Sequence, residues 1–308
     1  LQGEKVVLEA NKKHWKGRPN LDQVEFIFVP ESVSRMNMLN SGQVDTAFNL
    51  DIPDLEKVKQ DGKLNVVEWP TSELLYMTLN NLAKPTNETA VRQAIKLAID
   101  RKTIVNKVLL GHGALAQSYI APTTWGSYPV DKMIFDPEKA KKTLNDAGWI
   151  PGKDGIREKG GAKLTLKIRF PSGRYPMCDE VVAIIQNQLN NVGFQCLTEK
   201  MGFGAWISSL VLPREKSTGD AYIVSWPSKE DAHWAVTPMN SNSPLSFYQN
   251  EEVQKLIADQ FKTWDKAKRK EILKKIQEIA NQEAFGVNIF FMNYNIVSKK
   301  NVHGVEAT

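Results

Sequence analysis

Metal-binding and redox-active side chains are scarce in this sequence. Its 308 residues include two cysteines and four histidines. The histidines are His14, His112, His233 and His303. They lie too far apart in sequence for the close pair that a helical metal site requires, and no C-x-x-C motif is present. We therefore predict no resident metal and no cofactor.

The two cysteines, Cys178 and Cys196, flank a helical pattern that runs from about Asp179 to Val192. A helix of that length separates its ends by roughly 21 Å, whereas a disulfide needs Cα atoms within about 7 Å of each other. Cys196 begins the strand that follows, so it is expected near the far end of the helix. We predict two free thiols.

Long apolar segments are also missing. A membrane-spanning helix needs about 18 consecutive apolar residues, and the most apolar stretch, Gly286 to Met292, has only the length of a strand. The chain begins without the charged and apolar segments of a secretory leader. We therefore expect a soluble chain that either has lost a leader or is a fragment of a longer one.

The common signatures of catalysis and nucleotide binding are absent. The sequence contains no G-x-S-x-G elbow, no H-E-x-x-H, no P-loop and no G-x-G-x-x-G after a strand. The glycine pairs at Gly111 and Gly113 and at Gly202 and Gly204 are typical of turns. Because no nucleophile with an adjacent base stands out, we predict that the protein is not an enzyme.

The composition is that of a folded protein, with 42% hydrophobic and 24% charged residues. A length of 308 residues exceeds the size at which one core stops growing, so two domains are expected. The net charge of +5 is not gathered in arms. The densest basic stretch, Lys266 to Lys275, also contains Glu271, which is typical of a solvated helix face rather than a nucleic-acid patch.

Short strands and helices alternate along the chain, which predicts an α/β fold. Val24, Phe26 and Phe28, for example, fall on one face of a strand. Strands are expected at 5–11, 23–28, 46–49, 64–69, 72–81, 164–170, 194–199, 220–226 and 287–292. Helices are expected at 32–40, at 90–99 with a continuation to 110, and at 136–145, 179–191, 251–264 and 267–283. The start signal at Asp136-Pro137-Glu138 is complete, with Asp as N-cap and Pro at the first helical position.

Four groups of motifs occur in order along the chain. They are Val7-Leu8-Glu9-Ala10-Asn11 with His14-Trp15-Lys16-Gly17-Arg18-Pro19, Asn40-Ser41-Gly42-Gln43-Val44-Asp45, Val91-Arg92-Gln93-Ala94-Ile95 with Ala98-Ile99-Asp100-Arg101, and Phe135-Asp136-Pro137-Glu138-Lys139-Ala140 with Asp146-Ala147-Gly148. Together they resemble the periplasmic oligopeptide, dipeptide and nickel-binding family of ABC-importer receptors. Each motif also has a structural explanation, so the motifs indicate the fold and do not bind ligand.

The resemblance implies a two-lobed, type II periplasmic-binding-protein fold that closes on a ligand by a hinge. Similar proteins carry a further stretch before the point that matches Leu1, so lobe I is expected to be incomplete. On this basis residues 1–74 are the later half of lobe I, 75–288 are lobe II, and 289–308 return to lobe I. The missing N-terminal segment would be a partner if it is a separate chain.

The resemblance places ligand contacts on a cleft strand and a loop of lobe II. Main-chain hydrogen bonds are expected near Tyr76 and Asn80. In dipeptide binders, an Arg at the position of Arg174, in the loop from Pro171 to Pro176, pairs with the C-terminal carboxylate of the peptide. A planar guanidinium suits that role, although Arg174 is equally compatible with a solvated loop.

A second loop begins at Trp226. In the family, an Asp three residues after an aromatic pairs with the α-ammonium of the ligand, but this sequence has Lys229 there, which reverses the charge. A Lys beside an ammonium is repelled in a closed cleft. Glu230 or Asp231 is the expected replacement if the loop shifts by one residue.

The same loop contains His233 and Trp234. The nickel-binding branch has a His where His233 stands, so this residue is a candidate ligand of a metal complex or a residue of polar packing. Trp226 and Trp234 could stack on a sugar ring or a peptide side chain, whereas Trp206 is expected to be structural. Besides a peptide-like solute, the open ligand classes are an acidic or opine-like compound, an oligosaccharide and a nickel complex.

We therefore expect the substrate-binding component of an ABC importer, which captures a peptide-like small solute and delivers it to the permease subunits. Its location would be the periplasm or the outer face of the cell membrane, and no nucleic acid is expected as a partner. The alternatives from other classes are the ligand-sensing domain of a transcription regulator, which a cytoplasmic location would favour, and an enzyme, which turnover of a bound solute would reveal.

Overall fold

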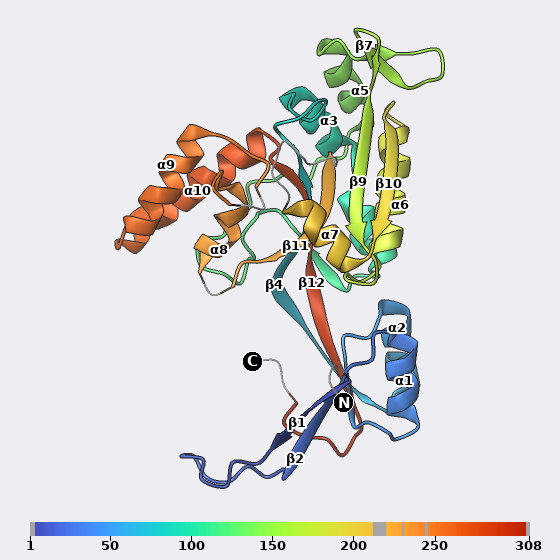
Figure 1. Cartoon of the computed structure of the whole chain (residues 1–308), viewed down its shortest axis with the longest axis vertical. Coiled ribbons are helices and arrows are strands. Elements are labelled where there is room, and N and C mark those ends of the chain that lie inside the picture. Colours follow the sequence, from blue (N-terminus) through green and yellow to red (C-terminus); the bar gives the residue numbers. More distant parts are fainter. Residues whose placement is uncertain (1–3, 212–219, 230, 244–245, 306–308) are drawn as a thin grey trace. The chain divides into compact units, whose positions relative to one another are not determined.

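The computed structural model describes residues 4–211, 220–229, 231–243 and 246–305. The chain divides into two compact units. The smaller unit comprises Leu1–Val67 and Asn295–Thr308, and the larger unit comprises Glu68–Tyr294. Two long strands, β4 (Asn65–Leu79) and β12 (Gly286–Ser298), run from one unit into the other (Figure 1). The assignment of these units to the predicted lobes, whose boundaries were placed at 74 and 288, remains a prediction.

The smaller unit combines a two-stranded antiparallel sheet with a small helical cluster. Its elements are β1 (Lys5–Glu9), β2 (Gln23–Ile27), α1 (Ser32–Asn40), β3 (Thr46–Phe48) and α2 (Ile52–Asp61). The core of the cluster is formed by Leu39, Leu50, Leu55, Val58 and Val297. Helix α1 has the predicted bounds, whereas α2 was not predicted.

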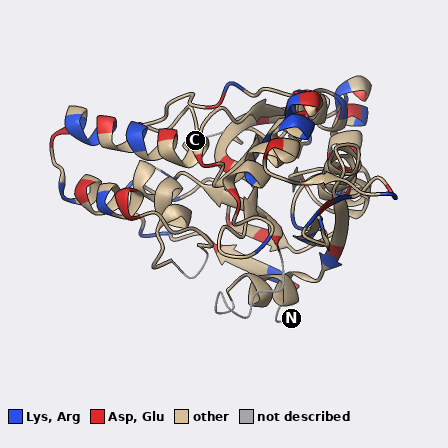
Figure 2. Ribbon diagram, turned by 90° about the horizontal axis from the view of Figure 1, so that it is seen from above, with Lys and Arg blue, Asp and Glu red and all other residues tan. Residues whose placement is uncertain are grey.

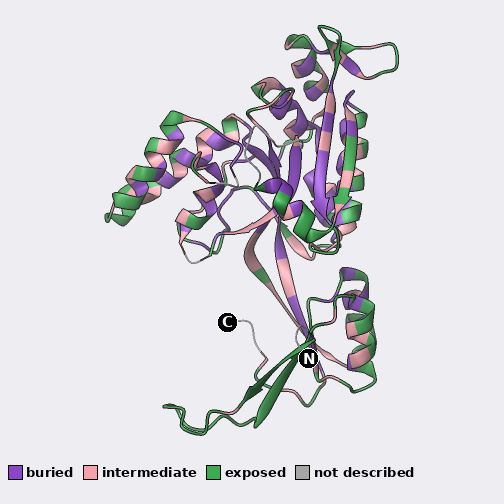
Figure 3. Cartoon of the chain, viewed as in Figure 1, coloured by how far each residue is buried: buried purple, intermediate pink, exposed green. Residues whose placement is uncertain are grey.

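The sheet of the smaller unit is exposed. Every residue of β1 and β2 is exposed, as Figure 3 shows. The apolar face of Val24 and Phe26 on β2 is therefore exposed, and so is Phe28 directly after the strand, at 60%. The alternation identified the strand correctly, but the described part of the chain does not bury the apolar face of that strand.

The larger unit is built on a mixed sheet, which confirms the predicted α/β class. The strands are β9 (Thr165–Pro171), β10 (Gln195–Met201), β11 (Ala221–Pro227), β4 and β12, in the order β10-β9-β11-β4-β12. Strand β9 is parallel to β10 and β11, whereas β11 is antiparallel to β4. Short β5 (Gly113–Leu115) also pairs with β12. Predicted strands 64–69 and 72–81 are one continuous strand, β4.

Helices lie on both sides of this sheet (Figure 1). They are α3 (Thr89–Ala98), α5 (Pro137–Asp146), α6 (Cys178–Asn190), α7 (Phe203–Leu210), α8 (Ala232–Val236), α9 (Glu251–Lys262) and α10 (Lys266–Gln282). A short helix η3 (Thr237–Met239) follows α8, and a three-stranded sheet is formed by β6 (Ile150–Pro151), β7 (Arg157–Lys159) and β8 (Ala162–Lys163). Helices α7 and α8 were not predicted.

Side-chain capping decides where several helices begin. The Asp136 carboxylate accepts a hydrogen bond from the Lys139 backbone N–H, so α5 starts as predicted. The predicted continuation of α3 to 110 is wrong. Helix α3 ends at Ala98, and Asp100 caps a new short helix, α4 (Arg101–Thr103), which a π-helical turn η1 (Ile104–Val108) follows. An Asp side chain competes for backbone N–H groups and so favours a helix start over a helix interior.

The hydrophobic core of the larger unit joins β4 and β11 to α8, α9 and α10, and it includes Trp206, which is 2% exposed. The hairpin of α9 and α10 carries its charges outside this core, and Figure 2 shows basic and acidic residues interspersed along both helices. The exposed charges of the stretch Lys266 to Lys275 therefore form a mixed, solvated face, whereas Leu273 of the same stretch is buried in the core. Cys178 and Cys196 are buried free thiols, as predicted.

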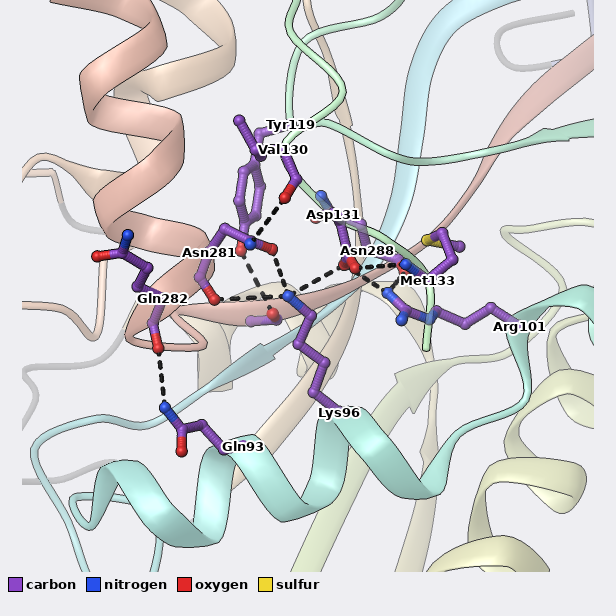
Figure 4. Close-up of polar contacts among 11 residues, drawn as sticks. Gln93, Lys96, Arg101, Tyr119, Val130, Asp131, Met133, Asn281, Gln282 and Asn288 are labelled. Carbon is purple, nitrogen blue, oxygen red and sulfur yellow. Dashed lines mark hydrogen bonds and ion pairs between the residues drawn. The ribbon is translucent and has the colours of Figure 1, made fainter. Parts of the chain in front are cut away.

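A cluster of buried charges lies where α3, α4 and β12 meet (Figure 4). Arg101 Nη1 lies 2.6 Å from Asp131 Oδ2, and Lys96 Nζ lies 3.1 Å from the same oxygen. Burial on its own raises the pKa of Asp131, but the charges of Arg101 and Lys96 outweigh burial and hold the pKa below its ordinary value. Arg101 also reaches the carbonyl of Asn288, 3.5 Å away, so the cluster helps to fix β12.

Candidate ligand-binding site

The loop that follows β11 is held by its own aromatic residues. The indole N–H of Trp226 donates a hydrogen bond to the carbonyl of Trp234, 2.6 Å away. Lys229, at a positive φ of 50°, places Nζ 3.9 Å from the centre of the Trp234 ring. Trp234 is 45% exposed. Because Lys229 lies over an aromatic ring, its charge has a favourable contact without a carboxylate.

Asp231 has a partner within the protein. Its carboxylate receives two hydrogen bonds from the guanidinium of Arg269, at 2.9 and 2.6 Å. It also accepts a hydrogen bond from the His233 backbone N–H and so caps α8. The hydrogen bond to Arg269 lowers the pKa of Asp231. This carboxylate fixes the loop to α10, and its predicted role opposite a ligand ammonium would require breaking a bidentate ion pair. Glu230, the other predicted replacement, lies outside the described residues.

His233 is also engaged by its neighbours. Its Nδ1 lies 2.7 Å from the side-chain nitrogen of Gln260, and its ring centre lies 5.0 Å from that of Phe261. Burial lowers the pKa of His233, so the ring is neutral near pH 7 and Nδ1 accepts the hydrogen bond. Among the described residues, no three His, Cys, Asp or Glu side chains gather as a protein-built metal site needs.

Arg174 is a cation that has no carboxylate partner among the described residues. It is exposed on the loop after β9, with its guanidinium carbon 5.3 Å from the centre of the Phe203 ring. No hydrogen bond or ion pair of the described residues involves its side chain. The next residue anchors the loop, because the Tyr175 hydroxyl oxygen accepts a hydrogen bond from the Ser225 backbone N–H, 3.1 Å away. Arg174 is thereby held beside β11.

The two predicted cleft-strand residues lie inside the larger unit. Tyr76 is 4% exposed in the core, and burial raises the pKa of its hydroxyl. Asn80 is 2% exposed, and its side-chain oxygen accepts a hydrogen bond from the Leu82 backbone N–H. It follows Leu79, which pairs with Ala221 at the opposite end of β11 from Trp226. At about 3.4 Å per residue, the distance from Ala221 to Trp226 along β11 is on the order of 17 Å. Asn80 is therefore not brought together with the Trp226 loop.

A carboxylate that sequence reasoning missed lies where the two loops meet. Glu73 on β4 pairs directly with Pro227, at the start of the Trp226 loop. Its Oε1 accepts a hydrogen bond from the Ser225 hydroxyl and its Oε2 accepts one from the Tyr294 hydroxyl. The signal in the sequence was a carboxylate directly before the apolar run Leu74 to Met77. The structure thus brings Glu73, Arg174 and Trp226 to one end of the sheet.

The phenols around Glu73 remain protonated. Burial raises the pKa of Tyr175 to about 12. Burial and the hydrogen bond to Glu73 raise the pKa of Tyr294. Both hydroxyls are therefore neutral at physiological pH.

A comparison with models of known protein families identifies the family of this chain. Residues 2–247 match the model of the bacterial extracellular solute-binding proteins, family 5. The chain belongs to this family. The predicted resemblance is therefore confirmed. Family 5 consists of solute-binding proteins and not of enzymes.

Curated relatives of this family 5 chain bind different solutes according to their names. The chain is 26% identical to the oligopeptide-binding protein AppA of Bacillus subtilis, over 98% of the chain and 56% of AppA. It is 28% identical to the probable D,D-dipeptide-binding periplasmic protein DdpA of Escherichia coli, over 98% of the chain and 57% of DdpA. The nickel-binding periplasmic protein of Escherichia coli is 24% identical over 95% of the chain and 57% of that protein.

Solved structures share the fold of the family 5 chain. Bacillus subtilis AppA, in complex with a nonapeptide, has a TM-score of 0.84 at 24% identity, covering 100% of this chain and 62% of AppA. NikA of Brucella suis, in complex with Fe(III)-EDTA, has a TM-score of 0.87 at 22% identity, covering 99% and 63%. The chain thus spans little more than half the length of the curated relatives. In its described part, no helix has the length and apolarity needed to cross a membrane.

Proposed function

We propose that this chain is the ligand-recognising part of the substrate-binding component of an ABC importer. It captures a peptide or peptide-like small solute outside the cytoplasm and delivers it to the permease. Membership of family 5 and the periplasmic relatives support this function. The observation that carries the peptide-like ligand is Arg174, whose guanidinium has no carboxylate partner among the described residues and lies on an anchored loop.

An unpaired guanidinium on such a loop suits a ligand carboxylate. Arg presents several N–H donors in a plane, which matches the two oxygens of a carboxylate. The Phe203 ring supports one face of Arg174. Ordering of the side chain on binding therefore costs less entropy than for a fully mobile Arg.

Two measurements test this function. The full-length protein from its native host is examined by native mass spectrometry for a small molecule that co-purifies, and that molecule is then titrated against wild type and Arg174→Gln. We expect a solute with a carboxylate and a loss of affinity of about tenfold or more in the variant, as for truncation of one partner of a charge pair. Lys153→Gln, which removes an exposed charge elsewhere in the larger unit, is the matched control.

Two results would contradict the proposal. An unchanged affinity in Arg174→Gln would show that Arg174 does not bind a ligand carboxylate, although the solute-binding function would stand. A full-length protein that carries no solute and binds no peptide, sugar or nickel complex would contradict the importer function itself.

A further inference from the structure

We propose that Glu73 is the specificity-determining residue through which the larger unit selects a ligand with an ammonium or guanidinium group. This inference rests on the proposed solute-binding function and adds to it the side chain that recognises the cationic end of the ligand. It differs from the expectation of a carboxylate on the Trp226 loop, because Glu73 belongs to β4.

The described hydrogen-bond partners of the Glu73 carboxylate are hydroxyl groups. Glu73 is partly buried on β4, and no Lys or Arg of the described residues forms an ion pair with it. A ligand cation would give Glu73 a direct ion pair, which Asp131 already has with Lys96 and Arg101.

The hydroxyls of Ser225 and Tyr294 orient this carboxylate without neutralising it. Each donates one hydrogen bond, to Oε1 and Oε2 respectively. A carboxylate has about four acceptor positions, so two hydroxyls leave room for N–H donors from a ligand. Tyr294 is held in turn by Trp69, whose ring centre lies 6.3 Å away in an edge-to-face contact. The carboxylate is thus fixed in place before a ligand arrives.

Among the described carboxylates that border the Trp226 loop, Glu73 is free of an ion pair, whereas Asp231 is not. Asp231 is bound by Arg269 in a bidentate ion pair, and Lys229 stands at the position where the family resemblance places an Asp. Glu73 lies opposite Pro227, the residue after Trp226, so it borders the same loop from the adjacent strand. Strand β4 thus offers a carboxylate beside the part of the loop that carries Lys229.

Arg174 adds the complementary charge. Its charge and that of Glu73 act on the same two phenols, because Arg174 lowers and Glu73 raises the pKa of both Tyr175 and Tyr294. Hydrogen bonds link the two regions, because the Ser225 backbone N–H donates to Tyr175, the residue after Arg174, and the Ser225 hydroxyl donates to Glu73. Arg174 and Glu73 form no ion pair with each other among the described residues. A ligand with one cationic and one anionic group would meet both.

The test uses matched ligands that differ only in charge. The probes are a dipeptide panel with varied side chains, each member in the free form, N-acetylated and C-amidated, together with nickel–histidine. Binding to the full-length native protein is measured by isothermal titration for wild type, Glu73→Gln and Tyr294→Phe. Gln keeps the size and one acceptor oxygen of Glu73, and thermal unfolding verifies that each variant is folded.

The expected result is a loss of discrimination. Wild type should bind free dipeptides at least about tenfold more tightly than the N-acetylated forms, and Glu73→Gln should bind both forms with similar, weaker affinity. Discrimination against the C-amidated forms should persist in Glu73→Gln, because Arg174 is intact. Tyr294→Phe should retain the preference for a free amine, because the charge remains.

Three other outcomes would overturn the proposal. If Glu73→Gln keeps the wild-type preference for a free amine, another residue recognises the cation. If wild type binds N-acetylated and free dipeptides equally, no cation is recognised. In both of these cases the proposed solute-binding function stands. If instead the wild-type protein binds no dipeptide, or binds only nickel–histidine, the peptide-like ligand and the role of Glu73 are rejected together.

Discussion

Two groups of charged side chains in the larger unit differ in how their charges are matched. In the buried group, the carboxylate of Asp131 lies within ion-pair distance of both Lys96 and Arg101. At the end of the sheet near the Trp226 loop, the partners of Glu73 in the described part of the chain are hydroxyls, and that of Arg174 is an aromatic ring. The carboxylate of the first group is paired within the protein, whereas Glu73 and Arg174 form no ion pair among the described residues, so a ligand could match their charges.

The largest effect is expected from breaking the buried group. Asp131→Ala leaves Lys96 and Arg101 without a carboxylate in a buried position, so we expect a loss of about 3–5 kcal/mol in the free energy of unfolding. Urea denaturation measures this loss. Asp45→Ala is the control, because it removes only an exposed pair with Lys299 and should cost less than about 1 kcal/mol. Similar losses in both variants would refute the stabilising role of the buried group.

The same group predicts a dependence of stability on pH. The pKa of Asp131 is lower in the folded protein than its ordinary value of 3.8. The carboxylate therefore contributes stability that is fully present above 3.8 and is lost as the pH falls through the lower pKa of the folded state. Urea midpoints measured at acidic pH should decrease less steeply in Asp131→Ala than in wild type. Equal slopes would show that other carboxylates account for the dependence.

A smaller effect should come from the loop itself. Asp231→Asn keeps an oxygen for the cap of α8 but loses the charge that faces Arg269. Because the Asp231 side chain is 47% exposed, solvent screens the pair, and we expect a loss of only about 1 kcal/mol in the free energy of unfolding.

The same variant also tests the binding role of the loop. If Glu73 rather than Asp231 recognises the cation, Asp231→Asn should retain the preference for a free amine in the dipeptide panel. Loss of that preference would assign the ammonium to the loop.

Local signals explain which parts of the fold were predictable. Helix α1 matches its predicted range of 32–40, and α5 begins at the capped start at Asp136. The class and family also followed from the sequence, because short motifs in a fixed order mark the family. The end of α3 did not follow, since the amphipathic pattern continues past Asp100 while the Asp100 side chain starts a new helix there.

The site was harder to predict than the fold because its contacts join residues that are distant in sequence. Glu73 bonds to Ser225 and Tyr294, which are 152 and 221 residues away. Asp231 meets Arg269 38 residues later, so its carboxylate looked available when the loop was considered alone. Arg174 was identified by family resemblance, and its lack of a protein partner could be seen only in three dimensions. Its role toward a ligand, like that of Glu73, stays a prediction.

The late position of β12 in the chain has a consequence for biosynthesis. This strand lies beside β4 within the sheet and also pairs with β5, yet it begins only at Gly286. While the ribosome is still adding α9 and α10, β4 lacks its neighbour on one side. Contacts of such long sequence separation form slowly. The sheet of the larger unit therefore cannot be completed before residues 286–298 have been made.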